Sequence, residues 1–295
     1  MVHSRPVTYS GVPTCSGNQS FRLWRLATTL LLAAMRGPSA WPSSRPAARA
    51  IAAALFCLWL LSLRLRDASI VDIFWGVGFV IIAWVTRASA TGAAARSALL
   101  LALVTLWGLR LAAYLAYRNL GKGEDPRYVA MRARHGDKWP LRSLFIVFAL
   151  QGALMWIISL PVQATLRSPL PEALGPLDAL GALVALTGVF FEAVGDLQLA
   201  RWKRDPDNRG KVMDRGLWRY TRHPNYFGDF LVWWGLYALA LAAGNAWTVI
   251  GPALMSFLLL RVSGVTLLEK SMRGRPGYDE YVRRTSAFFP WPPRP

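Results

Sequence analysis

Seven apolar blocks, each close to the length of a membrane-spanning helix, constrain this chain more than any other feature. The blocks lie near residues 47–63, 70–86, 97–117, 143–160, 177–199, 227–243 and 247–268. A helix needs about 20 residues to cross a bilayer. One such block would also suit a buried helix of a soluble protein, but seven blocks separated by basic loops indicate a membrane protein. The sequence therefore predicts an all-α fold, a polytopic membrane helix bundle of about seven transmembrane helices.

The net charge of +18 is distributed in the way typical of membrane proteins. Basic residues crowd the loops 118–142 and 200–226 and the tail after 268, whereas the alternate loops 161–176 and 244–246 carry little charge. This is the positive-inside pattern, so we expect a cytoplasmic C-terminus and no nucleic-acid partner. The high content of Ala, Arg and Trp is typical of a GC-rich bacterial genome, and hence of a protein in a bacterial cytoplasmic membrane.

Residues 1–45 differ in composition from the rest of the chain. They are rich in Ser, Pro, Gly and Arg, which predicts a poorly ordered N-terminal extension. Residues 46–295 show no internal repeat, and we expect them to form a single membrane domain. The two cysteines, Cys15 and Cys57, indicate neither a disulfide framework nor a metal site.

Polar pairs spaced four residues apart stand at three helix ends. They are Glu192 with Asp196, Asn225 with Asp229, and Glu269 with Arg273. An ionisable group at membrane depth costs a few kcal/mol, so each pair requires a partner or a function. If the fifth helix continues, Lys203 lies on the same face as Glu192 and Asp196. Such pairs either stabilise the helix ends or line a polar site beside the loop 200–226.

The segment Gly216–Asp229, with the sequence GLWRYTRHPNYFGD, leads into the sixth block. Pro224 disfavours helix at His223 and suits a helix start directly after it. Free N–H groups at a helix start attract anions, and arginines bind phosphate with two hydrogen bonds. The rings of Trp218, Tyr220 and Tyr226 offer faces for a planar base, although Trp and Tyr are also typical of an interfacial aromatic belt. The segment favours a phosphorylated nucleotide as its ligand.

The stretch Phe191–Gly235 resembles the C-terminal domain of steroid 5-alpha-reductases and, more closely, the bacterial proteins of unknown function grouped with that domain. The segments SIVDIFWGVGF, WGLRLAAYLAYRNLGKGEDPRY and YDEYVRRTSAFFPWPP are similar to the bacterial group as well, so the resemblance covers residues 69–294. In that superfamily NADPH lies within the C-terminal helices and donates hydride to an activated C=C bond of a lipid. The resemblance implies an NADPH-dependent oxidoreductase with a lipid-like substrate, in which residues 177–295 bind the cofactor.

The resemblance also implies a set of cofactor-binding residues. The positions matched by motif are Asp196, Lys203, Asn208, Trp218, Tyr220, Arg222, His223, Asn225, Tyr226, Asp229, Glu269, Arg273 and Tyr281. By charge rather than by motif, Arg204, Arg209 and Lys211 are expected to bind the diphosphate or the 2′-phosphate.

The catalytic half of the resemblance is less complete. Steroid reductases hold the enone with a carboxylate on the second helix and a tyrosine on the third. Asp72 matches the carboxylate, but Trp107 stands where the tyrosine is expected, which puts steroid specificity in doubt. Tyr114 or Tyr117, one or two turns further on, would have to replace it. Asp72 has another interpretation, a buried ion pair with one of two arginines, Arg66 or Arg110.

Two other classes of protein compete with the reductase. Isoprenylcysteine carboxyl methyltransferases and related phospholipid methyltransferases also carry an Arg-His-Pro-x-Tyr segment before a membrane helix and a Glu near the last helix end. Their cofactor is S-adenosylmethionine, which has no phosphate, whereas the basic loop 201–215 here suits a dinucleotide phosphate. The third interpretation is a non-enzymatic lipid-binding membrane protein.

Overall fold

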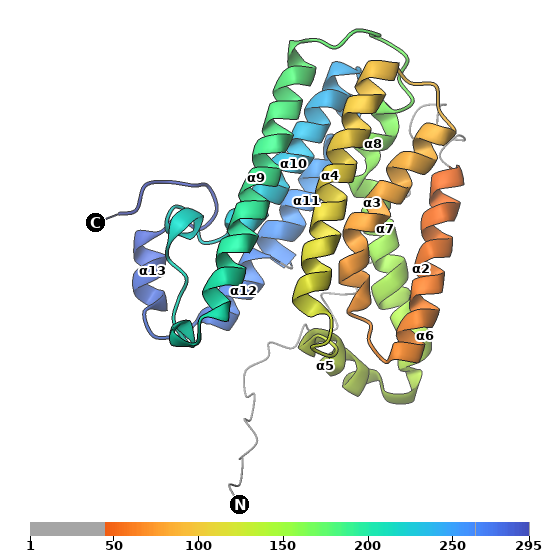
Figure 1. Ribbon diagram of the computed structural model, residues 1–295. Coiled ribbons are helices and arrows are strands. Elements are labelled where there is room, and N and C mark those ends of the chain that lie inside the picture. Colours follow the sequence, from red (N-terminus) through yellow and green to blue (C-terminus); the bar gives the residue numbers. More distant parts are fainter. Residues whose placement is uncertain (1–44, 263, 295) are drawn as a thin grey trace, which may run out of the picture.

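The computed structural model describes residues 45–262 and 264–294, and this part of the chain folds into a bundle of helices (Figure 1). Its one β-type contact is an isolated bridge between Thr221 and Ser286. The predicted N-terminal extension lies outside the described residues, apart from Arg45, which begins the first described helix.

The long helices of the bundle are α2 (Arg45–Leu65), α3 (Ile70–Ala88), α4 (Ala94–Asn119), α9 (Pro176–Arg204) and α10 (Pro224–Ala242). Between α4 and α9 the chain forms α5 (Pro126–His135), η2 (Gly136–Lys138), α6 (Trp139–Ser143), the π-helix η3 (Leu144–Ala149), α7 (Leu150–Ile158) and α8 (Leu160–Thr165). The C-terminal part adds η4 (Pro206–Asn208), η5 (Gly216–Arg219), η6 (Ala246–Val249), α11 (Ile250–Phe257), the π-helix η7 (Leu258–Val262), α12 (Val265–Met272) and α13 (Tyr278–Arg284).

Five helices of the described chain are long and apolar enough to cross a membrane, which places the protein among integral membrane proteins. They are α2, α3, α4, the continuous run Pro126–Ile158 and α9. The predicted spans 227–243 and 247–268 correspond to α10 and to the shorter apolar run Ala246–Val262, which are not among these five. The all-helical membrane fold is therefore confirmed, and the count of about seven spans is not.

The basic segment 118–142, predicted as a loop, is mostly helical. Asp125 caps α5 by accepting a hydrogen bond from the backbone N–H of Arg127 at 2.9 Å, and Pro126 occupies the first helical position. The cap residue and the proline are visible in the sequence, but the high charge of the segment favoured the prediction of a loop.

Glycines allow α9 and α10 to pack closely along their length. Gly181 and Gly188 of α9 face Gly235 and Gly228 of α10, so the two backbones meet without intervening side chains. A Cβ atom added at Gly188 would lie 2.6 Å from the backbone nitrogen of Val232. Small residues serve membrane helices in this way because lipid provides no hydrophobic drive for association.

A buried ion pair joins the start of α4 to the start of α9. The Nε of Arg96 lies 2.7 Å from Oδ1 of Asp178, and both side chains are 1% exposed. The same guanidinium also donates to the backbone carbonyls of Pro171 and Ala173, at 2.6 and 3.1 Å. A buried charge pair is stabilised only when its remaining hydrogen-bonding groups are satisfied in this way.

We predict that Gly188→Leu destabilises the protein by about 1–3 kcal/mol or more, because the added side chain must push α10 away from α9. The measurement is thermal unfolding of the purified protein in detergent. Leu186→Phe is the matched control, since it adds bulk to the exposed face of the same helix and should change the melting temperature little. Equal effects of the two substitutions would contradict the close-packing argument.

Candidate functional site

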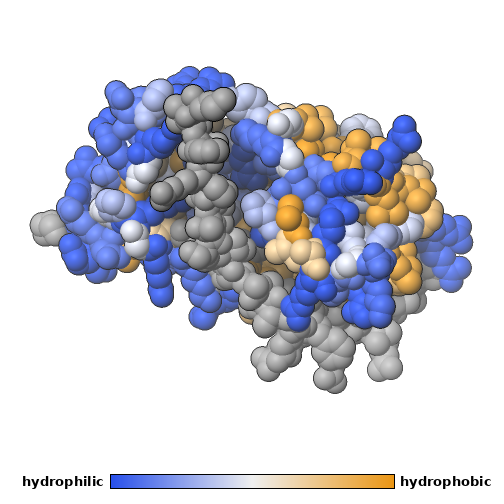
Figure 2. Space-filling view, turned by 90° about the horizontal axis from the view of Figure 1, so that it is seen from below, coloured by the Kyte–Doolittle hydropathy of each residue, from blue (hydrophilic) through white to orange (hydrophobic). Residues whose placement is uncertain are grey.

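Most of the predicted site residues gather at one end of the bundle, which we call the basic end. It comprises the starts of α3 and α10, the ends of α4 and α9, and the short helices α5, α12 and α13. Figure 2 looks onto this end and shows hydrophilic residues over much of it, with hydrophobic residues at one side.

A buried network around Arg110 occupies the interior of the basic end. Arg110 pairs with two carboxylates of α9, Glu192 and Asp196, and its Nη1 lies 2.7 Å from Oδ2 of Asp196. Trp107 Nε1 donates to Glu192 at 2.9 Å, and Asn225 Nδ2 donates to Asp196 at 3.2 Å. α9 continues to Arg204, which was the condition for the shared face of Glu192, Asp196 and Lys203, and Asn225 brings the polar pair of α10 to that of α9.

Asp229 adds a third carboxylate beside this network. Its Oδ1 and Nε1 of Trp233, one helical turn further on, are both buried and outside ordinary hydrogen-bond geometry, but the two side chains still interact as acceptor and donor. Asp229 also lies within electrostatic range of Arg110, so three carboxylates act on this guanidinium. A carboxylate has more than one acceptor position, so Asp229 can take a further donor beside Trp233.

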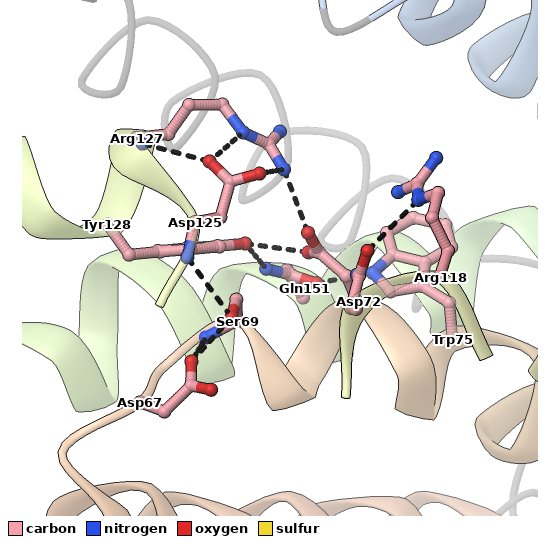
Figure 3. Close-up of polar contacts among 10 residues, drawn as sticks. Asp67, Ser69, Asp72, Trp75, Arg118, Asp125, Arg127, Tyr128 and Gln151 are labelled. Atoms are coloured by element: carbon pink, nitrogen blue, oxygen red, sulfur yellow. Dashed lines mark hydrogen bonds and ion pairs between the residues drawn. The ribbon is translucent and has the colours of Figure 1, made fainter. Parts of the chain in front are cut away.

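A second network surrounds Asp72 at the start of α3 (Figure 3). The hydroxyl of Tyr128 donates to Oδ1 of Asp72 at 2.7 Å, and Nη2 of Arg127 lies 2.8 Å from Oδ2. Gln151 donates to the Tyr128 oxygen at 3.3 Å and accepts from Trp75. The predicted alternative of an ion pair to Arg66 or Arg110 is therefore wrong, because the partner of Asp72 comes from α5.

The structure brings Tyr128, rather than Tyr114 or Tyr117, into contact with Asp72. The guanidinium of Arg118 lies 6.0 Å from the ring centre of Tyr114, and the hydroxyl of Tyr117 accepts from Arg204. Arg204, predicted to bind phosphate, thus joins the ends of α4 and α9.

The Arg-His-Pro-Asn-Tyr segment forms a third group with the C-terminal part of the chain. Arg222 donates to Oε1 of Glu269 at 2.9 and 2.6 Å and to the carbonyl oxygen of Thr285 at 2.6 Å. The His223 ring stacks on Tyr226, with centroids 5.6 Å apart, and its Nε2 lies 3.5 Å from Glu269. Burial lowers the pKa of His223 to about 4, despite the opposing attraction of the Glu269 carboxylate.

Two further predicted residues hold this segment in place. The hydroxyl of Tyr281 donates to the carbonyl of Trp218 at 2.6 Å, and Trp218 Nε1 donates to the carbonyl of Gly195 at 3.0 Å. Both side chains are buried, so these contacts join α13 to the segment and the segment to α9. Glu269 pairs with Arg222 rather than with its helical neighbour Arg273, whose side chain is exposed.

Lys203, an exposed residue near the end of α9, lies within electrostatic range of three other exposed cations, Arg118, Lys122 and Arg275. None of the four forms an ion pair within residues 45–262 and 264–294. The charge of Arg118 also acts on Asp72, Asp196 and Tyr226, so this residue stands between the first two networks.

The remaining predicted residues lie at the surface of the loop after α9. Arg209 and Lys211 line, with Tyr281, a cleft of about 450 Å³ between this loop and α13. Asn208 donates to the carbonyl of Trp202 at 3.2 Å, and Tyr220 is exposed. Among the described residues, no group of three or more His, Cys, Asp or Glu is arranged to hold a metal ion.

Sequence reasoning missed Arg118, Arg127, Tyr128 and Gln151 as members of the polar networks. Tyr128 and Arg127 belong to the stretch that resembles the bacterial group, so that stretch contained a usable signal. Gln151 is a single polar residue within an apolar block, which was the corresponding signal on α7.

These observations define a helical integral membrane protein with a buried, carboxylate-rich polar site below a group of cations. The chain belongs to the family described as "Protein of unknown function (DUF1295)", which matches residues 58–285. The uncharacterized protein C594.04c of Schizosaccharomyces pombe is 25% identical over 274 residues, covering 79% of this chain and 75% of that protein. The probable O-methyltransferase ustE of Ustilaginoidea virens is 25% identical over 160 residues, about half (52%) of each chain. No solved structure shows significant similarity.

We predict that Arg110→Met destabilises the protein by about 3–5 kcal/mol, because it leaves Glu192 and Asp196 buried without their counter-charge. Adding Glu192→Gln and Asp196→Asn should recover part of the loss. Thermal unfolding in detergent measures both effects. Arg64→Met removes an exposed arginine near the end of α2 and is the control. A loss no larger than that of the control would refute the role of Arg110.

The buried His223 makes stability depend on pH. In the unfolded chain it takes up a proton near its ordinary pKa of 6.5, whereas in the folded protein its pKa is about 4. Stability should therefore be unaffected above pH 6.5 and should fall by roughly 3 kcal/mol as the pH drops to 4. Because carboxylates also titrate there, the measured quantity is the difference between wild type and His223→Gln. The same difference for His135→Gln, a partly exposed histidine, should be smaller.

Proposed function

We propose that the protein is a membrane-embedded, NADPH-dependent reductase of an activated C=C bond in a lipid. The observation that carries the proposal is the group of four cations at the basic end, Arg118, Lys122, Lys203 and Arg275, which lack an ion pair within the described chain. The four side chains are exposed and carry the same charge, so all of them would attract an anion placed among them. A 2′-phosphate and a diphosphate are anions of the required charge, and arginine binds them with good geometry.

The buried network below these cations fits the other end of such a cofactor. Asn225 and the remaining acceptor positions of Asp229 can hydrogen-bond a carboxamide, as a nicotinamide carries. The cofactor when bound would supply hydride to the β-carbon of an α,β-unsaturated carbonyl compound. The contribution of the chain is to orient the nicotinamide and to exclude water around it.

Asp72 and Tyr128 are the proposed groups on the substrate side. Tyr128 is the phenol that contacts Asp72, so it replaces Tyr114 as the candidate partner for the carbonyl oxygen. A hydrogen bond from Tyr128, or from a protonated Asp72, would stabilise the negative charge that develops on that oxygen. Gln151 and Arg127 hold the two side chains in position.

The membrane setting favours a lipid as the substrate. Asp72 lies at the start of α3, a helix apolar enough to cross the bilayer, so a substrate can reach it from the lipid phase. The clustering of positive charge at the basic end supports a cytoplasmic location for this end, where NADPH is available.

A methyltransferase is the second candidate, because a relative over half of the chain is named a probable O-methyltransferase. The contacts of Glu269 with Arg222 and His223 also unite the motif residues shared with membrane methyltransferases. The reductase remains favoured because S-adenosylmethionine has no phosphate for the four cations.

The discriminating experiment compares the melting temperature of the purified protein with NADPH, NADH and S-adenosylmethionine. We expect NADPH to stabilise the protein by about 2.7 kcal/mol at 100 times its dissociation constant. The double variant Lys203→Gln with Arg275→Gln should weaken this stabilisation, because it removes two of the four cations proposed to bind the phosphates. Arg134→Gln with Lys138→Gln is the charge-matched control, since both residues are exposed on the segment after α4.

Stabilisation by S-adenosylmethionine alone would make the methyltransferase the function. Stabilisation by neither ligand would favour a non-enzymatic lipid-binding protein.

Once a substrate is found, Asp72→Asn and Tyr128→Phe should each lower turnover while leaving NADPH binding unchanged. Full turnover by both variants would show that neither side chain takes part in the reaction.

A further inference from the structure

The last residues of the described chain form a segment whose backbone is held firmly. The N–H of Arg222 donates to the carbonyl of Ser286 at 2.9 Å, and the N–H of Trp291 donates to the carbonyl of Tyr220 at 3.0 Å. The hydroxyl of Thr221 donates to the carbonyl of Phe288 at 2.8 Å. The segment therefore has one defined conformation against the start of α10.

Large aromatic side chains nevertheless project from this segment. Trp291 is 70% exposed and Phe289 is 61% exposed, and the neighbouring Tyr220 is 44% exposed. Figure 1 shows α13 and the tail to the side of the lower part of α9, where lipid would surround the bundle, rather than beneath it. Exposed Trp and Tyr side chains at this position are typical of the interface between lipid headgroups and acyl chains.

A basic pocket of about 370 Å³ lies beside Trp291, which is one of its lining residues. It is also lined by four arginines, which are Arg222 before α10, Arg283 and Arg284 at the end of α13, and Arg294. Arg222 is paired with Glu269, and Arg284 lies 3.4 Å from Glu280. Arg283 and Arg294 have no ion pair within residues 45–262 and 264–294. None of the described residues that line the pocket is acidic, so its free charge is positive.

We propose that this pocket binds the headgroup of an anionic phospholipid from the surrounding bilayer. The free arginines complement a phosphate, and the exposed rings would lie among the adjoining acyl chains. Each cation near an anionic lipid surface strengthens binding appreciably, and a defined backbone lowers the entropy lost on binding. The pocket does not include Lys203, Arg118 or the Asp72 network, and its residue Arg222 is already paired with Glu269, so the proposal does not rest on the proposed reductase function.

The test is a lipid titration of the full chain in detergent, followed by native mass spectrometry. Phosphatidylglycerol is compared with phosphatidylcholine of the same acyl chains, and we expect phosphatidylglycerol to be retained preferentially. Arg283→Gln with Arg294→Gln should weaken phosphatidylglycerol binding by roughly 30-fold, since each basic residue contributes about a factor of 5. Arg134→Gln with Lys138→Gln removes the same charge elsewhere and should change binding by less than about 3-fold.

Two more measurements distinguish lipid binding from the binding of a free anion and from a folding defect. Trp291→Ala keeps every charge and should still weaken phosphatidylglycerol binding, which covers the case in which the double arginine variant fails to fold. An excess of inorganic phosphate should leave the lipid bound, and its displacement would show a site for free anions instead. Equal retention of the two lipids, or equal loss in the charge-matched control, would overturn the proposal.

Discussion

The interaction on which the polar site depends is the buried pairing of Arg110 with Glu192 and Asp196. A charge within the apolar bundle is tolerable only beside an opposite charge, so this contact ties α4 to α9 at one relative height. Asn225 extends the same network to α10, and Trp107 closes it from α4. Asp229 of α10 lies beside the same network, with Trp233 of the same helix as its neighbouring donor.

Close helix packing makes this network possible. The facing glycines of α9 and α10 bring the two backbones together, so the short side chain of Asn225 reaches Asp196. At the opposite end, Arg96 and Asp178 join α4 to α9 a second time. The two ion pairs restrain both ends of the same helix pair, and α3, which packs against α4, brings Asp72 to Tyr128 of α5.

The polar and aromatic residues of the basic end serve different roles. Arg222, Trp218 and Tyr281 make their hydrogen bonds to the protein itself, whereas Lys203, Arg118, Lys122 and Arg275 form no ion pair within the described chain. The family has no assigned function, and the similarity of this chain to a methyltransferase covers half of its length. The proposed choice of a phosphorylated cofactor therefore rests on these cations.

The sequence by itself determined the membrane class, the long apolar helices and the local spacing of polar residues. Hydropathy and the 3.6-residue period act within one helix, so the shared face of Glu192 and Asp196 followed from the residue pattern alone, whereas α9 continues to Arg204, past the predicted end at 199. The partners were decided by tertiary structure. Asp72 meets Tyr128 across 56 residues, and Arg110 meets Asp196 across 86. The order and tilt of the packed helices decide which side chains meet over such separations. A local residue pattern does not predict these two properties.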